Sequence, residues 1–144
     1  MVVKILHWLG ITACLVLIVS CFLPWGYYAD AQIVHEGDRV FNGFYSYKHY
    51  YGKPGFIFSF FALLTGAFML LPKLWAKRVN LFMSAFILAY AVRTFIVFGA
   101  CYNNYCPQKM FGLYLMLAST VLIMLASVFP NVSLSDKKEG SFYL

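Results

Sequence analysis

Four long apolar runs, almost free of charge, constrain the fold of this chain more than any other feature. They cover about residues 8–25, 56–71, 79–100 and 110–129, and Arg93 is the one charged side chain within them. A helix needs roughly 20 apolar residues to cross a hydrocarbon core of about 30 Å. The runs therefore predict an all-α membrane protein, a bundle of four transmembrane helices of which the second is short.

The composition argues against a soluble domain. Of the 144 residues, 62% are hydrophobic and 11% are charged, which is more apolar surface than a soluble domain of this size buries. No segment resembles a linker, so we expect residues 1–144 to form a single membrane domain. The formal charge of +6 does not indicate nucleic-acid binding, because the basic residues are scattered at the ends of the apolar runs.

The distribution of Lys and Arg predicts the orientation, because positive residues in short loops are retained on the cytoplasmic side. The side with both termini carries Lys4, Lys73, Lys77, Arg78, Lys137 and Lys138. The opposite side carries Arg39, Lys48, Lys53 and Lys109. We therefore expect both termini in the cytoplasm, with a tail over residues 131–144 and an outer loop over residues 26–53.

The first run also has features of a targeting segment. Lys4 precedes it, and residues 18–21 (Ile-Val-Ser-Cys) resemble the site at which bacterial lipoproteins are cleaved and lipidated. Residues 22–25 (Phe-Leu-Pro-Trp) continue the span without a soluble domain after it. We therefore expect this segment to be retained as the first transmembrane helix.

Small residues share a face in each run and predict helix contacts, since they let backbones approach closely in lipid. The predicted packing residues are Gly10, Cys14, Gly66, Ala85, Ala89, Gly112, Ser119 and Ala126. The seven-residue spacing of the last three favours left-handed crossings. These faces suit the helices of a partner protein as well as those of the chain itself.

Arg93 is the most informative single residue, because a charge inside a span costs several kcal/mol unless it is paired, hydrated or able to reach the interface. It lies four residues beyond Ala89, so we expect it to point into the bundle or into a protein contact. In the functional interpretation it binds a carboxylate, a lipid phosphate or another subunit, and Asp30 is the candidate partner within the chain. In the alternative, it snorkels to the outer interface about two turns away.

The outer loop is aromatic in its second half, where seven of the eleven residues 41–51 are Phe, Tyr or His. Aromatic side chains with a polar tip favour the headgroup level, so we expect this segment to lie on the membrane surface. The alternative is a platform that binds a quinone, a lipid or a protein. The candidate contact residues are Phe41, Phe44, Tyr45, Tyr47, Tyr50 and Tyr51.

The positions of the cysteines and histidines favour a structural role over metal binding or catalysis. Cys101 and Cys106 flank a short outer turn, where an oxidising compartment favours a disulfide. The three histidines have no ligand spacing and none lies deep in a span, so we expect no metal site and no haem. No catalytic motif and no glycine-rich nucleotide loop is found, so no cofactor is expected.

Two short motifs carry a resemblance to a known group of proteins. Leu23-Pro24-Trp25 closes the first run, and Asn42-Gly43-Phe44 lies in the outer loop. In these elements the chain resembles a set of small uncharacterised bacterial four-span membrane proteins, mainly over residues 15–70. The resemblance implies a four-span fold in the bacterial cytoplasmic (inner) membrane and no particular activity.

Two classes of function follow from these features. The first is a non-catalytic accessory, assembly or scaffolding subunit of a larger membrane complex, favoured by the small-residue faces and Arg93. The second is a membrane thiol/disulfide protein, or one that binds a quinone or a lipid, using Cys101, Cys106 and the aromatic loop. The expected partners are the lipid bilayer and other membrane subunits, with no nucleic acid.

Overall fold

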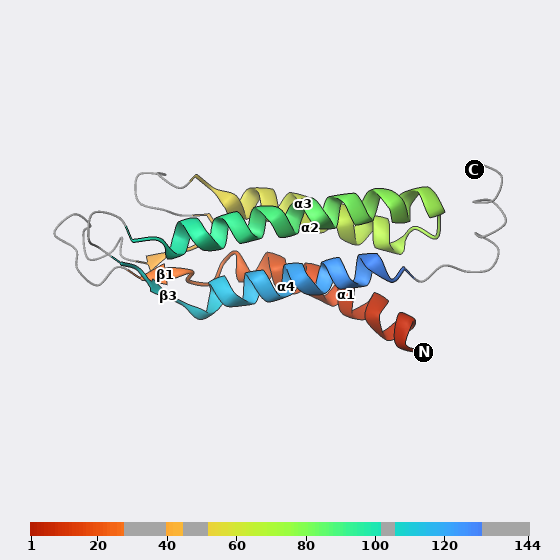
Figure 1. Cartoon of the computed structure of the whole chain (residues 1–144), viewed down its shortest axis with the longest axis horizontal. Helices are drawn as coiled ribbons and strands as arrows, with labels where there is room; N and C mark the ends of the chain where they lie inside the picture. The colour runs from red at the N-terminus through yellow and green to blue at the C-terminus, as the bar shows by residue number, and fades with distance from the viewer. Residues whose placement is uncertain (28–39, 45–51, 102–105, 131–144) are drawn as a thin grey trace.

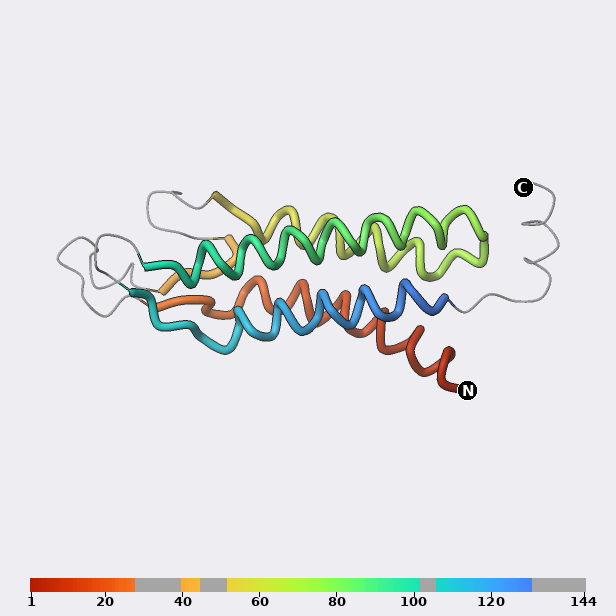
Figure 2. Tube along the Cα trace, in the orientation of Figure 1, coloured from red at the N-terminus to blue at the C-terminus, as the bar shows by residue number. Residues whose placement is uncertain are grey.

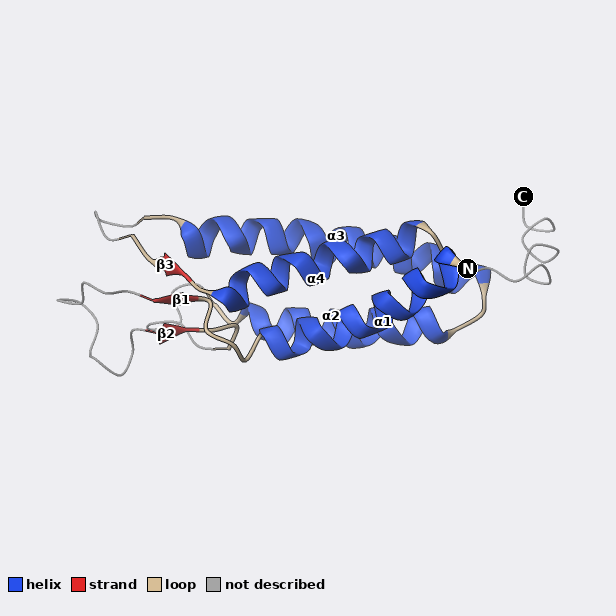
Figure 3. Cartoon of the chain, turned by 90° about the horizontal axis from the view of Figure 1, so that it is seen from below, coloured by secondary structure: helices blue, strands red, loops and turns tan. Residues whose placement is uncertain are grey.

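The computed structural model describes residues 1–27, 40–44, 52–101 and 106–130, and most of them are helical. Four helices lie along one another in an elongated bundle: α1 (Val2–Ser20), α2 (Pro54–Leu70), α3 (Leu74–Gly99) and α4 (Phe111–Val128) (Figure 1). Helices α1 and α3 each pack mainly against α2 and α4, which closes the four into a ring (Figure 3). The predicted helical bundle is confirmed as an arrangement of helices.

The helix ends differ from the predicted spans. Helix α1 ends at Ser20 and not at Trp25, because Pro24 disfavours helical backbone at the residue before it and the chain tightens into i→i−3 hydrogen bonds from residue 21. Helix α3 begins at Leu74, so Lys77 and Arg78 belong to the helix and not to the preceding turn. Helices α1, α3 and α4 are long and apolar enough to cross a membrane, while α2 has 17 residues.

The closest helix contact joins α1 to α4. A Cβ atom added at Gly10 would lie 2.5 Å from Ala126 Cβ, and one added at Gly112 would lie 2.6 Å from Pro24 O. Glycine at both positions therefore lets the two backbones approach at each end of the contact. The predicted packing residues Gly10, Cys14, Gly112, Ser119 and Ala126 are buried here.

Several buried hydroxyl side chains donate hydrogen bonds within their own helices, whereas the buried Thr65 hydroxyl on α2 has no partner among the described residues. Buried Ser20, Thr94 and Thr120 donate hydrogen bonds of 2.7–2.8 Å to the carbonyls of Leu17, Tyr90 and Leu117. Such bonds to the preceding turn satisfy these hydroxyl donors within a single helix. Side-chain bonds also join α3 to α4: Asn80 Nδ2 donates to Ser127 Oγ at 3.0 Å, and Ser84 Oγ donates to Met124 Sδ at 3.5 Å.

A small antiparallel sheet, which the all-α prediction did not include, closes the end of the bundle away from the N-terminus. We call this the outer end and the opposite one the inner end, after the predicted orientation. Strand β1 (Gly26–Tyr27) pairs with β2 (Val40–Phe41) on one side and with β3 (Gln108–Lys109) on the other. Two-residue strands drawn from three distant segments have no recognisable hydrophobic period. The sheet ties the α1–α2 connection to the α3–α4 connection.

Trp25 holds the outer end together. Its indole is fully buried, stacks edge-on against Phe58 and Phe98, and donates a hydrogen bond from Nε1 to Ser20 O at 2.7 Å. Its backbone N–H donates to Phe41 O and its carbonyl accepts from Met110 N–H. One residue therefore connects α1, the sheet and the start of α4.

The opposite end carries the N-terminus and the α2–α3 turn (Figure 2). Lys77 is buried there and donates a hydrogen bond from Nζ to Met69 O at 3.0 Å. Carbonyls at a helix C-terminus lack helical donors and carry partial negative charge, so an ammonium group beside them is favourable. Lys77 thus caps α2.

The α1–α4 contact leads to a prediction for Gly10→Leu. The new side chain would overlap Ala126 and Met69, so we expect the free energy of unfolding to fall by about 1–3 kcal/mol. Unfolding in mixed micelles with increasing SDS, followed by circular dichroism, measures the change. Ala118→Leu adds three of the same four side-chain carbons at an exposed position of α4 and serves as the control. Equal stability of Gly10→Leu and the wild type would contradict the close contact.

Candidate partner-contact surface

Arg93 lies on the outside of the bundle. Its side chain is exposed, six residues before α3 ends at Gly99, and its Cζ lies 6.0 Å from the centroid of the Tyr90 ring. No ion pair involves Arg93 within the part of the chain that the structure describes. Of the two expected directions, the one into the bundle is wrong, because the rotation of α3 turns this face outward; the one into a protein contact stays a prediction. Asp30, its candidate partner, lies outside the described residues.

Ala85 and Ala89 share the outward face with Arg93, and both are exposed. They do not pack inside the bundle as the other predicted small residues do. The inner face of α3 is formed instead by Asn80, Ser84, Ile87, Ala91, Thr94 and Phe98. These positions recur at intervals of four and three residues, a signal that the sequence reasoning missed because it followed alanines and not the small polar residues.

Gly66 on α2 takes an intermediate position. It is partly buried, and a Cβ atom there would lie 3.9 Å from Cys14 Cβ, at ordinary van der Waals distance. The α1–α2 contact is therefore looser at this point than the α1–α4 contact at Gly10.

The two described aromatic candidates of the outer loop face protein. Phe41 is 3% exposed and belongs to the core, so its assignment to a contact surface is wrong. Phe44 is half-buried and packs its ring against Phe22 at 4.8 Å and Phe56 at 5.1 Å between centroids. The other candidates, Tyr45, Tyr47, Tyr50 and Tyr51, lie outside the described residues.

The glycines beside these aromatic residues explain the short motifs of the sequence. A Cβ atom at Gly43 would lie 2.9 Å from Cys21 O, and Gly43 N–H donates a hydrogen bond to that carbonyl. Gly55 N–H in turn donates to Gly43 O. Residues 42–44 therefore pass between the end of α1 and the start of α2, with no room for a side chain at position 43.

The cysteines divide into two pairs with different surroundings. Cys101 and Cys106 form the predicted disulfide, and both are exposed beside the sheet. Cys14 and Cys21 are free thiols buried in and directly after α1, where Cys21 Sγ donates to Leu17 O. Among the described residues, no group of three or more His, Cys, Asp or Glu side chains is placed to hold a metal ion.

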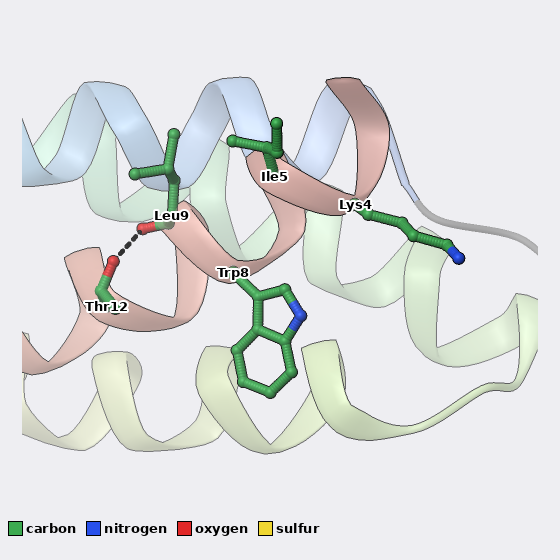
Figure 4. Close-up of a pocket in the computed structure, with 5 residues that line it drawn as sticks. All are labelled: Lys4, Ile5, Trp8, Leu9 and Thr12. Atoms are coloured by element: carbon green, nitrogen blue, oxygen red, sulfur yellow. Dashed lines mark hydrogen bonds between the residues drawn. The ribbon is translucent and has the colours of Figure 1, made fainter. Parts of the chain in front are cut away.

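A shallow groove runs along the inner half of α1 (Figure 4). It is lined by Lys4, Ile5, Trp8, Leu9 and Thr12, which follow one face of the helix at intervals of three and four residues. Thr12 Oγ1 bonds to Leu9 O at 2.9 Å, so its hydroxyl is already used. The groove offers an apolar surface with one cation at its end, which suits contact with lipid and carries no catalytic group.

Two surfaces therefore stand out on the described part of the molecule, the α1 groove and the outward face of α3. The α3 face differs in placing a charge beside small residues well within a membrane-length helix.

Comparison with protein-family models, with curated proteins and with solved structures finds no match for this chain.

Proposed function

We propose that this chain is an integral protein of the bacterial cytoplasmic membrane that crosses the bilayer four times, with both termini in the cytoplasm. Three helices of spanning length support this, together with their lateral packing. Helix α2 rises about 26 Å over its 17 residues, which suffices if the bilayer thins slightly around it. The N-terminus and the α2–α3 turn lie at the same end of the bundle (Figure 2), and Lys4, Lys73, Lys77 and Arg78 belong to the first turns of α1 and α3 or directly precede them, as expected for the cytoplasmic side.

We further propose that the protein is a non-catalytic accessory, assembly or scaffolding subunit of a larger membrane complex. The observation that carries this function is the outward face of α3. An arginine within a span costs several kcal/mol when lipid surrounds it, and exposed alanines leave a flat strip on the same face. Both features favour contact with another protein over contact with lipid acyl chains.

The structural roles of Leu23-Pro24-Trp25 and Asn42-Gly43-Phe44 support the fold implied by the resemblance to small bacterial four-span proteins. Trp25 and Gly43 join the outer ends of α1, α2 and α4. These motifs therefore relate to assembly of the bundle and not to a reaction.

The proposed subunit role predicts a stable particle larger than one chain. After extraction in digitonin, native electrophoresis should show this chain together with other membrane proteins in a fixed ratio. The same sample dissociated in SDS provides the control for the size of the single chain. Migration as a lone monomer under mild extraction would contradict the proposal.

A second candidate function is favoured by the exposed disulfide. In this alternative, reduced Cys101 and Cys106 transfer two electrons and two protons to a quinone, which yields the disulfide and a quinol. The aromatic outer loop would hold the quinone or a lipid near these cysteines.

Thiol trapping distinguishes this alternative. Membranes treated with a reductant and then with a soluble quinone are alkylated, and the mass of the chain reports the state of the pair. Exchange predicts free thiols before quinone and a disulfide after it, with Cys101→Ser as the control. A disulfide that stays oxidised under both treatments would contradict electron transfer and indicate a structural role for these cysteines.

A further inference from the structure

Exposed residues on α3 form a continuous seam. Phe82, Ala85, Ala89, Val92 and Ile96 are all exposed and follow one another at intervals of three, four, three and four residues. This is the spacing at which two helices meet in a left-handed crossing. We call these five residues the α3 seam. Its two alanines lie where an approaching backbone would come closest.

Arg93 borders this seam, and the direction of its side chain matters. In an α-helix the Cα–Cβ bonds tilt toward the N-terminus. Arg93 lies about 9 Å from the C-terminal end of α3, so this tilt directs it away from the nearer interface. Its guanidinium accordingly lies over Tyr90, one turn back toward the middle of the helix. The side chain is not extended toward the outer headgroups.

A cation held in that position requires a counter-charge from outside the four helices. None of α1, α2, α3 or α4 contains an Asp or a Glu. The ring face of Tyr90 supplies about 0.5–2 kcal/mol of cation–π attraction, less than the cost of an unpaired charge in hydrocarbon. A carboxylate would also accept two parallel hydrogen bonds from the guanidinium.

We propose that the α3 seam binds a transmembrane helix of another protein, and that this helix places an Asp or Glu beside Arg93. The inference rests on the proposed role as a subunit and names the partner by its chemistry. The partner backbone packs over Ala85 and Ala89 between the larger side chains of the seam. The Arg93–carboxylate pair sets the depth and register of the partner helix, as a lone polar pair does in an apolar interface.

Photo-crosslinking identifies what covers the seam. A diazirine-bearing amino acid at position 89 is activated in intact membranes, and the attached peptide is sequenced by mass spectrometry. We expect a transmembrane segment of another protein that contains Asp or Glu, while the same probe at exposed position 118 of α4 labels lipid. Attachment at position 89 only to lipid, to a second copy of this chain, or to a segment without an acid overturns the inference.

A charge exchange tests the pair itself. Arg93→Glu should lower the fraction of chain in the complex about tenfold, the effect of 1–2 kcal/mol between transmembrane helices. Changing the acid of the crosslinked segment to Arg should restore the complex in the Arg93→Glu background. Failure of this restoration, with thermal unfolding showing both variants folded, overturns the proposed pair. If Arg93→Glu does not fold, Arg93→Gln and the removal of the partner acid should each lower the complex, and together no further than either alone; additive losses overturn the pair.

Steric variants separate this inference from the proposed function. Ala85→Leu and Ala89→Leu should each reduce the complex, whereas Ala67→Leu on α2 and Ala118→Leu on α4 add the same bulk at other exposed positions and should not. A wild-type chain that migrates alone removes the subunit role. A wild-type complex that persists in all four variants leaves the subunit role intact and overturns the seam.

Discussion

The structure depends most on the close approach of α1 and α4. Gly10 against Ala126 and Gly112 against Pro24 O bring the first and last helices together at both ends of their contact. In the proposed membrane setting, where no hydrophobic force drives helices together, such backbone proximity supplies much of the packing energy between helices. Helices α2 and α3 then complete the ring against this pair. The fixed α1–α4 geometry also brings Trp25 beside the start of α4, which the outer sheet requires.

At the outer end, backbone groups pair through two-residue strands and single loop hydrogen bonds instead of a long helix or strand. Residues beyond α1 exchange hydrogen bonds with residues near α2 and before α4, through Trp25, Gly43 and Met110. In the proposed membrane setting, each unpaired backbone group near hydrocarbon costs several kcal/mol, and the short sheet and the bonds of Gly43 avoid this cost. At the inner end, Lys77 Nζ donates a hydrogen bond to Met69 O, one of the carbonyls at the C-terminal end of α2.

The sequence predicts the number and approximate place of the helices, because a run of apolar residues is a strong local signal. It predicts the rotation of α3 poorly, because this helix is apolar on nearly every side and only a few small polar residues distinguish its inner face. Asn80, Ser84 and Thr94 mark that face better than Ala85 and Ala89, since buried hydroxyls and amides find partners within a bundle. Arg93 was recognisable as important from its charge, whereas its outward direction depends on tertiary packing. Strand pairing between residues 26–27, 40–41 and 108–109 was not predictable from segments this short and this distant.

The sheet also bears on the order in which the chain is assembled. Strand β1 follows the first helix, yet one of its two partners, β3, directly precedes the last. The carbonyls of Pro24 and Trp25 obtain their donors from Gly112 and Met110, which a ribosome delivers near the end of synthesis. In the proposed membrane protein, the segment after α1 therefore lacks these two donors while α2 and α3 are inserted. When α4 is inserted, Met110 and Gly112 therefore supply the last donors to the segment that follows α1.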